Sequence, residues 1–382
     1  MTSLFPNPYQ PVLWSPNRLQ LSWLAKKVPV RVIAPIPWTT ERQGRKRFGN
    51  LTKKTRRFTI DNLEVEQPTY WFPPGLWRSS YGRWFRWSVR SVFERAVKEF
   101  QPTLIFAYWA YPDGWAAVKL GHEHNLPVVI QVMGSDVLQL AQVKGRTAGT
   151  AEALCEADGV WAVSQDLANH VIRFGANPDR VKLIYDGVDT SLFYPGSQAE
   201  ARTRLSLNSS KKIILFVGNL VQVKAIDRLI LAFDQLYHQR GDLELAILGQ
   251  GELQPKLEAQ ARMLRCASAV KFHGSKPQET LPDWYRAADV FALPSDSEGV
   301  PNVLLEASAC GLPYVASNVG GIHEIADRGH GTLVPVGDIA ALARALEAAL
   351  NAKRPVAIPP RTREACIDEF IQWMEQIAAR RH

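Results

Sequence analysis

The sequence predicts an α/β protein with two doubly wound domains. Its 382 residues are more than one ordinary core needs, and 46% of them are hydrophobic, which is ample for two cores. Short apolar runs rich in β-branched residues alternate with amphipathic segments along the chain. This alternation is typical of βαβ units, in which helices cover both faces of a mainly parallel sheet.

The first domain is predicted from four apolar runs with the pattern of buried strands. These runs are 28–35, 103–109, 127–133 and 159–164. Residues 76–100 predict an amphipathic helix between the first two. Its aromatic side carries Trp77, Tyr81, Trp84, Phe85 and Val92, and its polar side carries Arg78, Arg83, Arg86 and Arg90. Such a helix either packs on the sheet or attaches to an anionic membrane surface, with Trp and Arg at the headgroup level.

A second series of strands begins after a polar stretch, 194–212, that has no strand pattern. The runs are 213–218, 243–249, 269–274, 289–295 and 313–317, and helices are predicted over 340–350 and 363–381. We therefore expect an N-terminal domain over 1–194, a second domain over 195–362, and a C-terminal helix, 363–382, that packs back on the first domain. The carboxyl ends of the strands in both sheets are expected to face one cleft.

The composition argues against several classes of protein. Four scattered cysteines without a close pair predict neither a disulfide framework nor a zinc site, so a reducing cytoplasm is expected. No run approaches the ~18 apolar residues of a membrane span, and residues 1–14 lack the pattern of an export signal. The net charge is +8, but no nucleic-acid-binding motif accompanies it. His122 and His124 have no evident third ligand, so no metal is predicted.

The run SDSEGVPNVLLEASACGLP, residues 295–313, is the most informative stretch of the chain. Gly299 allows the backbone to approach a ligand, and Pro301 suits the first position of a helix, whose N-terminus would attract anions. Glu298 lies in the loop and Glu306 inside the helix, where a carboxylate can accept two neighbouring ribose hydroxyls. This spacing suits a nucleotide-sugar donor, although an ordinary capped helix with two solvated glutamates fits it as well.

A second ligand element follows the strand at 213–218. Gly218 permits a close backbone approach, and Lys224 stands near the start of the next helix. A helix N-terminus with one ammonium can seat a diphosphate whose charge grows as its bond to a sugar breaks. A solvated lysine is the alternative, but the position after a strand and a glycine turn favours phosphate binding.

With these two elements, the chain resembles the retaining glycosyltransferases of family 4, which have the two-domain GT-B fold. Glu298 and Glu306 match the family's pair of glutamates separated by seven residues. Further matches are Gly218, Leu220 and Lys224 to its GxLxxxK element, Gly187, Val188 and Asp189 to its GVD linker motif, and Gly320 and Gly321 to its late glycine pair. The opening SLFPNPYQPVL and the YPDG at 111–114 are most similar to bacterial members that build exopolysaccharide or teichuronic-type wall polymers.

The resemblance implies two Rossmann-like domains facing a cleft and a role for each matching residue. Glu306 would bind the donor ribose, Lys224 the diphosphate, and Glu298 the hydroxyls of the transferred sugar, so Glu298 and Lys224 are the catalytic candidates. The donor is expected to contact Gly218, Asn219, Lys224, Glu298, Gly299, Val300, Pro301, Asn302 and Glu306. The family retains the anomeric configuration by front-face displacement, so no side-chain nucleophile is assigned. No metal or other cofactor is implied, because protein charge neutralises the diphosphate.

Three departures from the family pattern bear on function. Asn219 stands where many relatives have arginine, which removes a charge-assisted contact worth roughly 1.5–3 kcal/mol. Met133 replaces a histidine that can touch the donor sugar, and it precedes Gly134, Ser135 and Asp136, which are candidates for the acceptor or sugar side. Asp136 alternatively caps a helix. Only Met1 and Thr2 precede Ser3, so the first strand of the first domain is predicted to be missing, which would expose unpaired backbone.

The expected function is therefore transfer of a sugar from a UDP- or GDP-sugar to a glycan, lipid-linked or polysaccharide acceptor by a retaining hexosyltransferase. The protein is expected in the cytoplasm, with peripheral attachment to the inner face of the plasma membrane through residues 76–100. The alternatives are a degenerate GT-B protein that binds a sugar nucleotide or a partner without catalysis, and a membrane-recruited assembly component. No nucleic-acid partner is expected.

Overall fold

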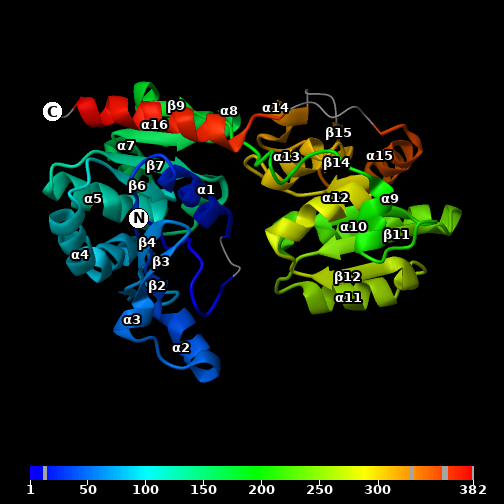
Figure 1. Ribbon diagram of the computed structural model, residues 1–382, viewed down its shortest axis with the longest axis horizontal. Helices are drawn as coiled ribbons and strands as arrows, with labels where there is room; N and C mark the ends of the chain where they lie inside the picture. The colour runs from blue at the N-terminus through cyan, green and yellow to red at the C-terminus, as the bar shows by residue number, and fades with distance from the viewer. Residues whose placement is uncertain (12–14, 327–330, 355–359, 381–382) are drawn as a thin grey trace. The chain divides into compact units, whose positions relative to one another are not determined.

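The computed structural model describes residues 1–11, 15–326, 331–354 and 360–380. They divide into two compact units (Figure 1). Unit 1 comprises Met1–Tyr185 and Glu364–His382, and unit 2 comprises Asp186–Arg363. The division after Tyr185 corrects the boundary predicted at 194, which was placed by the polar composition of the stretch that follows.

Residues after Tyr185 belong to unit 2 because their backbone pairs with its last residues. The Val188 amide donates to the Arg361 carbonyl at 2.9 Å, and the Arg363 amide donates to the Val188 carbonyl at 2.8 Å. A Cβ added to Gly187 would come within 2.2 Å of the Thr362 carbonyl oxygen, so this approach requires glycine. The GVD motif thus fixes the place where the chain enters unit 2.

The described residues of unit 1 form three short sheets. Their strand orders are β1-β4-β3, β6-β7-β8-β9 and β2-β5. The strands are β1 (Arg31–Ile33), β2 (Ile36–Pro37), β3 (Arg57–Ile60), β4 (Leu63–Glu66), β5 (Thr69–Tyr70), β6 (Ile105–Tyr108), β7 (Val128–Val132), β8 (Gly159–Ala162) and β9 (Val181–Leu183). β6 to β9 pair in parallel, as expected for βαβ units. β3 and β4 form an antiparallel hairpin that the sequence analysis did not predict.

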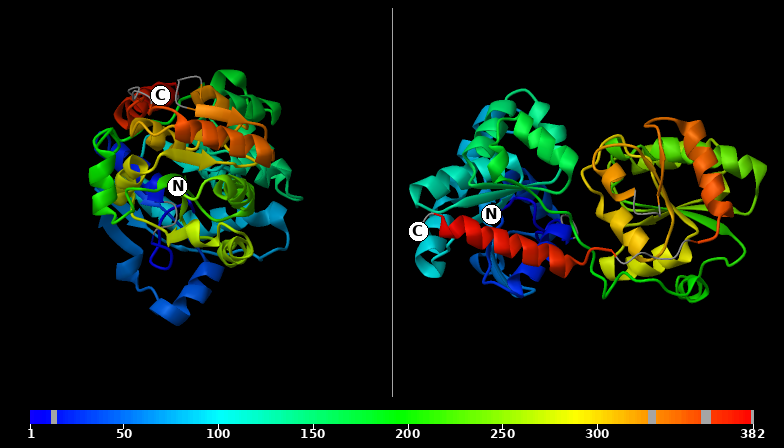
Figure 2. Two further views of the ribbon diagram at one scale, coloured as in Figure 1. Left: turned by 90° about the vertical axis from the view of Figure 1, so that its right-hand side faces the viewer. Right: turned by 90° about the horizontal axis from the view of Figure 1, so that it is seen from above.

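Helices cover both faces of the four-stranded sheet in unit 1. The helices are α1 (Ser15–Ala25), α2 (Trp38–Phe48), α3 (Lys53–Arg56), α4 (Tyr81–Phe100), α5 (Trp115–Glu123), α6 (Ser135–Leu138), α7 (Thr147–Glu156), α8 (Gln165–Arg173) and α16 (Arg363–Ala379). On one face, the Phe370 ring of α16 lies 4.7 Å from Phe106 and 4.3 Å from Trp161. On the other face, Gly121 of α5 packs tightly against Val128 of β7. Figure 2 shows α16 running beside the N-terminus.

The aromatic residues that were predicted to share one face of the long helix α4 do not all point the same way. The buried residues of α4 are Gly82, Phe85, Val89, Val92, Phe93 and Ala96. Trp77, just before the helix, is 73% exposed, and Trp84 and Trp87 are 37% and 62% exposed. Phe85 and Val92 therefore pack inward, whereas the tryptophans face solvent. Within the described part of the chain, no helix combines the length and hydropathy needed to cross a bilayer.

The first residues of the chain lie between β1 and β6. The Thr2 amide donates to the Ile33 carbonyl of β1 at 3.0 Å, and the Met1 amino group donates to the Phe106 carbonyl of β6. β1 and β6 are end strands of two separate sheets. The strand predicted to be missing is thus represented by only a few residues at this position, and the sheet of unit 1 is split there.

In unit 2, the residues that the structure describes form one six-stranded parallel sheet in the order β12-β11-β10-β13-β14-β15. The strands are β10 (Lys212–Val217), β11 (Leu243–Leu248), β12 (Val270–Gly274), β13 (Val290–Leu293), β14 (Tyr314–Ser317) and β15 (Gly331–Val334). The helices are α9 (Gln198–Arg204), α10 (Ile226–Gln239), α11 (Gln254–Arg262), α12 (Leu281–Ala287), α13 (Asn302–Ala309), α14 (Ile322–Ala326) and α15 (Ile339–Asn351). α10 packs beside α15, and α12 packs beside α9 and α13. This doubly wound arrangement matches the prediction, with β15 as an additional edge strand.

Candidate donor site in unit 2

The candidate site lies where the strand order of unit 2 reverses. From β10 the chain builds outward through β11 to β12, and it then returns to the other side of β10 as β13. β10 and β13 are neighbours, with Leu215 paired to Phe291. The loops that leave their carboxyl ends diverge, and in open parallel sheets this switch point is where ligands bind. Both elements singled out in the sequence follow these two strands.

Lys224 and Glu298 meet at this switch point. Lys224 ends a short 3₁₀ turn after β10, and Glu298 lies in the loop after β13. The Lys224 Nζ lies 2.5 Å from the Glu298 Oε1, and 21% of the lysine side chain and 10% of the glutamate side chain remain exposed. A partly buried ammonium and carboxylate in contact can turn toward an anion and toward sugar hydroxyls. Both residues were predicted from the sequence as site residues, but their direct contact was not.

Glycines hold the two loops against their neighbours. Gly249, with a φ of 141°, follows β11 and lies so close to Gly218 that an added Cβ would come within 1.8 Å of its carbonyl oxygen. Gly320, with a φ of 55°, lies equally close to the Glu298 carbonyl, at 1.9 Å. The Gly321 amide donates to the Gly299 carbonyl at 2.9 Å. The backbone on either side of the Lys224–Glu298 pair is therefore fixed by close packing that side chains would prevent.

Helix α13 begins directly after the loop that carries Glu298. It starts at Asn302, so Pro301, which was predicted for the first helical position, is instead the N-cap residue that precedes the helix. Gly299 and Val300 are buried. The Asn302 Oδ1 and the Ser295 Oγ are also buried and have no hydrogen-bond partner within the protein. Because buried polar groups are normally paired, these two atoms are well placed for a ligand that supplies the partner.

Glu306 lies one turn into α13 and is only 6% exposed. Its Oε2 accepts a hydrogen bond from the Tyr285 hydroxyl at 2.9 Å. Burial raises the pKa of Glu306 to about 7, against the opposing effect of the hydrogen bond from Tyr285. The carboxyl is therefore poised between its neutral and charged forms near neutral pH. Tyr285 was not identified from the sequence, because only the fold brings it to Glu306.

Two further contacts at the site escaped the sequence analysis. Arg228 lies in the first turn of α10, which begins at Ile226, and its Nη2 lies 3.2 Å from the Asp296 Oδ2 in the loop that carries Glu298. The Leu220 amide donates to the Gln250 carbonyl at 3.0 Å, so the turn after β11 supports the turn after β10. The sequence signal for this supporting turn was the pair Gly249 and Gly251, which flank Gln250 at the end of the strand predicted over 243–249. The side chain of Asn219 is exposed.

The predicted acceptor-side residues of unit 1 lie after β7. Asp136 is 2% exposed. Its Oδ1 accepts from the amides of Met133 and Gly134 at 3.0 and 3.1 Å, and its Oδ2 accepts from the Ala110 amide at 3.2 Å. Burial raises the pKa of Asp136 above its usual range. The carboxylate thus fixes two loops, and Gly134, not Asp136, occupies the N-cap of α6. Ser135 is exposed.

The histidines near the end of α5 have other contacts. The Nδ1 of His122 lies 3.6 Å from the Glu156 carboxylate, and the ring of His124 packs edge-on against Phe93 at 5.3 Å. Over the residues that the structure describes, no group of three or more histidine, cysteine or acidic side chains is arranged to hold a metal ion.

Two family models match the chain. The model described as glycosyl transferases group 1 matches residues 197–370, and the model described as glycosyltransferase family 4 matches residues 19–192. The chain is 34% identical over 263 residues to D-inositol 3-phosphate glycosyltransferase 2 of Catenulispora acidiphila, covering 65% of this chain and 61% of the relative. It is 37% identical over 218 residues to the D-inositol 3-phosphate glycosyltransferase of Frankia alni, covering 54% of each. The matches thus span between 54% and 61% of these two curated relatives.

Solved structures share the fold. Sucrose-phosphate synthase from Thermosynechococcus elongatus superimposes with a TM-score of 0.72 and 24% identity, covering 95% of this chain and 90% of that one. Anabaena HepE in complex with UDP and glucose has a TM-score of 0.72 and 21% identity, covering 94% of this chain and 95% of that one.

Proposed function

Because the chain belongs to the group 1 and family 4 glycosyltransferases and has their GT-B fold of two Rossmann-like domains, we propose that it transfers a sugar from a nucleotide-sugar donor. The donor is a UDP- or GDP-sugar, and the acceptor is a glycan, a lipid-linked sugar or a polysaccharide. The observation that carries the proposal is the contact of Lys224 with Glu298 at the strand switch point, with Glu306 buried on the adjoining helix. UDP and UDP-glucose in structures of Anabaena HepE support this donor class.

Each side chain has a distinct part in donor binding. Lys224 turns from Glu298 to the diphosphate, which it neutralises together with the amide groups at the start of α13. Glu298, once released from the lysine, accepts hydrogen bonds from the hydroxyls of the transferred sugar. Glu306 accepts hydrogen bonds from two neighbouring ribose hydroxyls. Gly218, Asn219 and residues 299–302 supply close backbone contacts.

The reaction proceeds with retention of the anomeric configuration. The bond between the anomeric carbon and the diphosphate oxygen breaks, and the acceptor oxygen forms its bond to the same face of that carbon. The acceptor proton passes to an oxygen of the leaving diphosphate. Lys224 stabilises the charge that develops on that diphosphate, so its contribution is larger in the transition state than in the ground state.

A donor screen tests the proposal. The chain is incubated with UDP-glucose, UDP-galactose, UDP-N-acetylglucosamine and the corresponding GDP-sugars, and release of the free nucleotide is measured with and without a mixture of glycan and lipid-linked acceptors. We expect release from one nucleotide class, accelerated by an acceptor. Tight binding of a nucleotide sugar with no release under any condition would favour the degenerate alternative, in which the site binds without catalysis.

The affinity for a nucleotide sugar is expected to fall as the pH falls below about 7. Burial raises the pKa of Glu306 to about 7, so at lower pH its carboxyl is protonated before the ligand binds. Ribose hydroxyls donate best to the charged form, so binding must expel this proton, and each pH unit below the pKa weakens affinity by at most about tenfold. Calorimetric titrations with UDP-glucose and GDP-glucose at pH 6, 7 and 8 measure the slope.

The matched control for this slope is Glu306→Gln, which keeps the size of the side chain and removes its titration. The variant is expected to bind more weakly than the wild-type chain at pH 8 and to show little pH dependence. A nucleotide sugar is used because it lacks the terminal phosphate of UDP, which itself titrates near pH 6. If affinity depends on pH equally in the two proteins, the assignment of Glu306 to the ribose is wrong.

We also propose that unit 1 attaches to an anionic membrane surface, where a lipid-linked acceptor would lie. Trp77 and Trp87 are 73% and 62% exposed, and Leu76 is 63% exposed. Arg78 and Arg83 are exposed within the same stretch. Exposed tryptophan beside arginine is typical of surfaces that sit at the headgroup level.

Removing the two arginine charges is expected to weaken this attachment. A double variant, Arg78→Gln with Arg83→Gln, loses two interactions of about 1 kcal/mol each with anionic lipid, which corresponds to roughly thirtyfold in partitioning. Sedimentation with vesicles containing phosphatidylglycerol at low salt measures the change. Arg173→Gln on α8 is the control and should partition nearly as the wild-type chain does. If the wild-type chain does not bind these vesicles, the attachment proposal is wrong.

A further inference from the structure

Tyr285 and Glu306 form a buried polar pair in the interior of unit 2. Tyr285 is 0% exposed and Glu306 is 6% exposed. The tyrosine ring contacts two other aromatic rings, with centroids 6.0 Å from Phe193 and 5.8 Å from Phe291. Because this packing holds the ring in place, its hydroxyl has a fixed position, from which it donates to the Glu306 Oε2 at 2.9 Å. The carboxylate is therefore met by a rigid hydrogen-bond donor.

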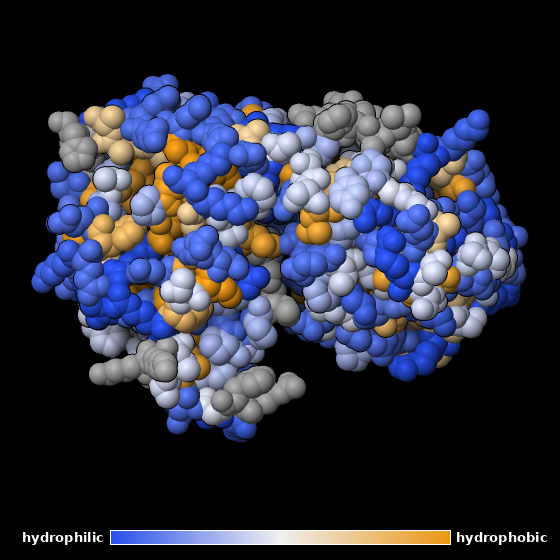
Figure 3. Space-filling view, viewed as in Figure 1, coloured by the Kyte–Doolittle hydropathy of each residue, from blue (hydrophilic) through white to orange (hydrophobic). Residues whose placement is uncertain are grey.

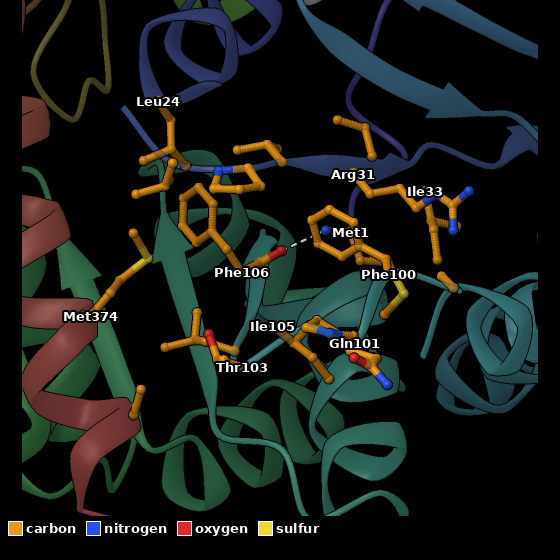
Figure 4. A pocket seen from close by; sticks show the side chains of 18 of the residues that line it. Met1, Leu24, Arg31, Ile33, Phe100, Gln101, Thr103, Ile105, Phe106 and Met374 are labelled. Atoms are coloured by element: carbon orange, nitrogen blue, oxygen red, sulfur yellow. Dashed lines mark hydrogen bonds between the residues drawn. The ribbon is translucent and has the colours of Figure 1, made fainter. Parts of the chain in front are cut away.

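Polar partners set this pair apart from the apolar features of unit 1. Hydrophobic side chains gather on one face of that unit (Figure 3). A cavity of about 450 Å³ is lined there largely by apolar side chains such as Leu24, Ile33 and Phe106 (Figure 4). Side chains of this kind offer no hydrogen bonds to a ligand. In unit 2, by contrast, a hydroxyl and a carboxylate meet in the packed interior, where leaving either group unpaired would be costly.

The groups around Glu306 decide its charge. Burial raises the pKa of Glu306 to about 7, and the hydrogen bond from Tyr285 opposes that shift, as do the positive charge of Arg363 and a hydrogen bond from Gln278. Burial, with the negative charge of Glu306, raises the pKa of the Tyr285 phenol well above its usual range, so the hydroxyl keeps its proton. Burial likewise raises the pKa of the nearby Cys310 thiol to about 12. Tyr285 therefore acts as a neutral donor that favours the charged form of Glu306.

A donor fixed on one oxygen determines how the rest of the carboxylate can be used. A carboxylate offers about four acceptor positions on its two oxygens, and the Tyr285 hydroxyl occupies one of those on the Glu306 Oε2. It thereby holds the carboxylate plane in one orientation. Two neighbouring ribose hydroxyls can then donate to positions that remain. A 2′-deoxyribose supplies only one of these hydroxyls, so an oriented carboxylate would keep an unpaired acceptor.

We propose that Tyr285 is a positioning residue of the donor site: its hydroxyl orients the Glu306 carboxylate, so that the site selects ribonucleotide sugars over their 2′-deoxyribose analogues. This inference rests on the proposed function, in which Glu306 binds the donor ribose. Tyr285 acts through Glu306 and not on the donor itself. Without the hydroxyl, the carboxylate rotates more freely and takes up a proton more readily, so it binds ribose less tightly and discriminates less against the deoxy form.

Calorimetry with matched ligands tests the inference on the full chain. UDP-glucose, GDP-glucose and their 2′-deoxyribose analogues are titrated at pH 8 into the wild-type chain, Tyr285→Phe and Tyr237→Phe. We expect the wild-type chain to bind its ribonucleotide sugar at least about tenfold more tightly than the deoxy analogue. In Tyr285→Phe the affinity for the ribonucleotide sugar should fall about tenfold, and the preference should shrink below about threefold. Tyr237, half-buried on α10, is the matched control and should change neither value.

The ratio of the two affinities separates positioning from a general structural effect. A purely structural defect in Tyr285→Phe weakens both ligands alike, so an unchanged preference overturns the inference even if both affinities fall. A wild-type preference below about threefold overturns it without any variant. If the wild-type chain binds no nucleotide sugar, the proposed function fails together with the inference, whereas an unchanged preference in a chain that binds tightly concerns Tyr285 alone.

The charge of Glu306 gives a second readout that needs no ligand. Carbon-13 NMR of glutamate carboxyl groups follows their titration, and the Glu306 signal is the one that is lost in Glu306→Gln. Its midpoint is expected near the pKa of about 7 in the wild-type chain and in Tyr237→Phe. Because Tyr285→Phe removes a hydrogen bond to the charged form, the midpoint should rise by about one pH unit. A midpoint that stays in place in folded Tyr285→Phe would show that the hydroxyl does not act on this carboxylate and would overturn the inference.

Discussion

Replacing Lys224 with alanine is expected to reduce sugar transfer by about 10²–10³-fold, the usual effect of removing one preorganised group that stabilises transition-state charge. The lysine lies 2.5 Å from Glu298 at the switch point between β10 and β13. In the proposed reaction its ammonium meets the departing diphosphate. Because the charge on that diphosphate grows as the bond to the sugar breaks, the loss should appear mainly in kcat. Steady-state kinetics with the active donor measure both kcat and KM.

Loss of Lys224 also leaves the Glu298 carboxylate, whose side chain is only 10% exposed, without its cation. The free energy of unfolding is therefore expected to fall by about 1–3 kcal/mol, and thermal unfolding must confirm that the variant is folded under assay conditions. Lys271→Ala, which removes an exposed lysine from β12, is the matched control and should leave kcat within about twofold, as surface charges away from a site contribute little. A Lys224→Ala variant that is folded and transfers sugar at the wild-type rate would exclude a role for this lysine.

Glu298→Gln is expected to abolish most transfer, with at least a hundredfold loss of kcat, while the chain remains folded and still binds free nucleotide. The amide keeps the size of the side chain and can still accept from Lys224, but it loses the charge that holds the sugar hydroxyls. Since Glu298 is assigned to the sugar and not to the diphosphate or ribose, affinity for UDP or GDP should change by no more than about threefold. Kinetics and calorimetry on the same preparation separate the two effects.

The control for Glu298→Gln is Asp296→Asn in the same loop. Asp296 pairs with Arg228 and is two positions from Glu298, so the substitution tests whether any loss of charge in this loop suffices. We expect its effect on kcat to be far smaller than that of Glu298→Gln. Full transfer activity in a folded Glu298→Gln protein would contradict the assigned role, and equal losses in both variants would reduce it to a general effect on the loop.

Much of the candidate donor site in unit 2 could be predicted from the sequence, because each of its elements is formed by residues close together in the chain. A strand, a glycine turn and a helix start can be recognised within a few residues, which locates Gly218 and Lys224, and the same applies to the loop from Glu298 to Glu306. The contact between Lys224 and Glu298 joins residues 74 positions apart, and it depends on β13 pairing directly with β10. The burial of Glu306 and its bond from Tyr285 likewise arise only from the packing of α12 against α13.

The β3–β4 hairpin was not predicted and the buried face of α4 was predicted incorrectly, for two separate reasons. The β3–β4 hairpin is a short, half-exposed pair whose outward residues include Arg57 and Glu64, so it lacks the apolar run used to recognise strands. Its signal was the Asp61–Asn62 turn, where both residues adopt positive φ. For α4, a helical wheel groups residues by angle but does not say how wide the buried stripe is, so Trp84 was placed with the buried Phe85.

The central claim is that unit 2 binds a nucleotide sugar through Lys224, Glu298 and Glu306, and a ligand-induced shift in thermal unfolding tests it most directly. The wild-type chain is melted with increasing UDP, GDP and their glucose conjugates at pH 8, beside Glu306→Gln. We expect one nucleotide class to stabilise the wild-type chain, by about 2.7 kcal/mol at a hundred times its Kd, and the variant to need at least tenfold more ligand for the same shift. No stabilisation by any of these ligands, or equal stabilisation of wild type and variant, would contradict the claim.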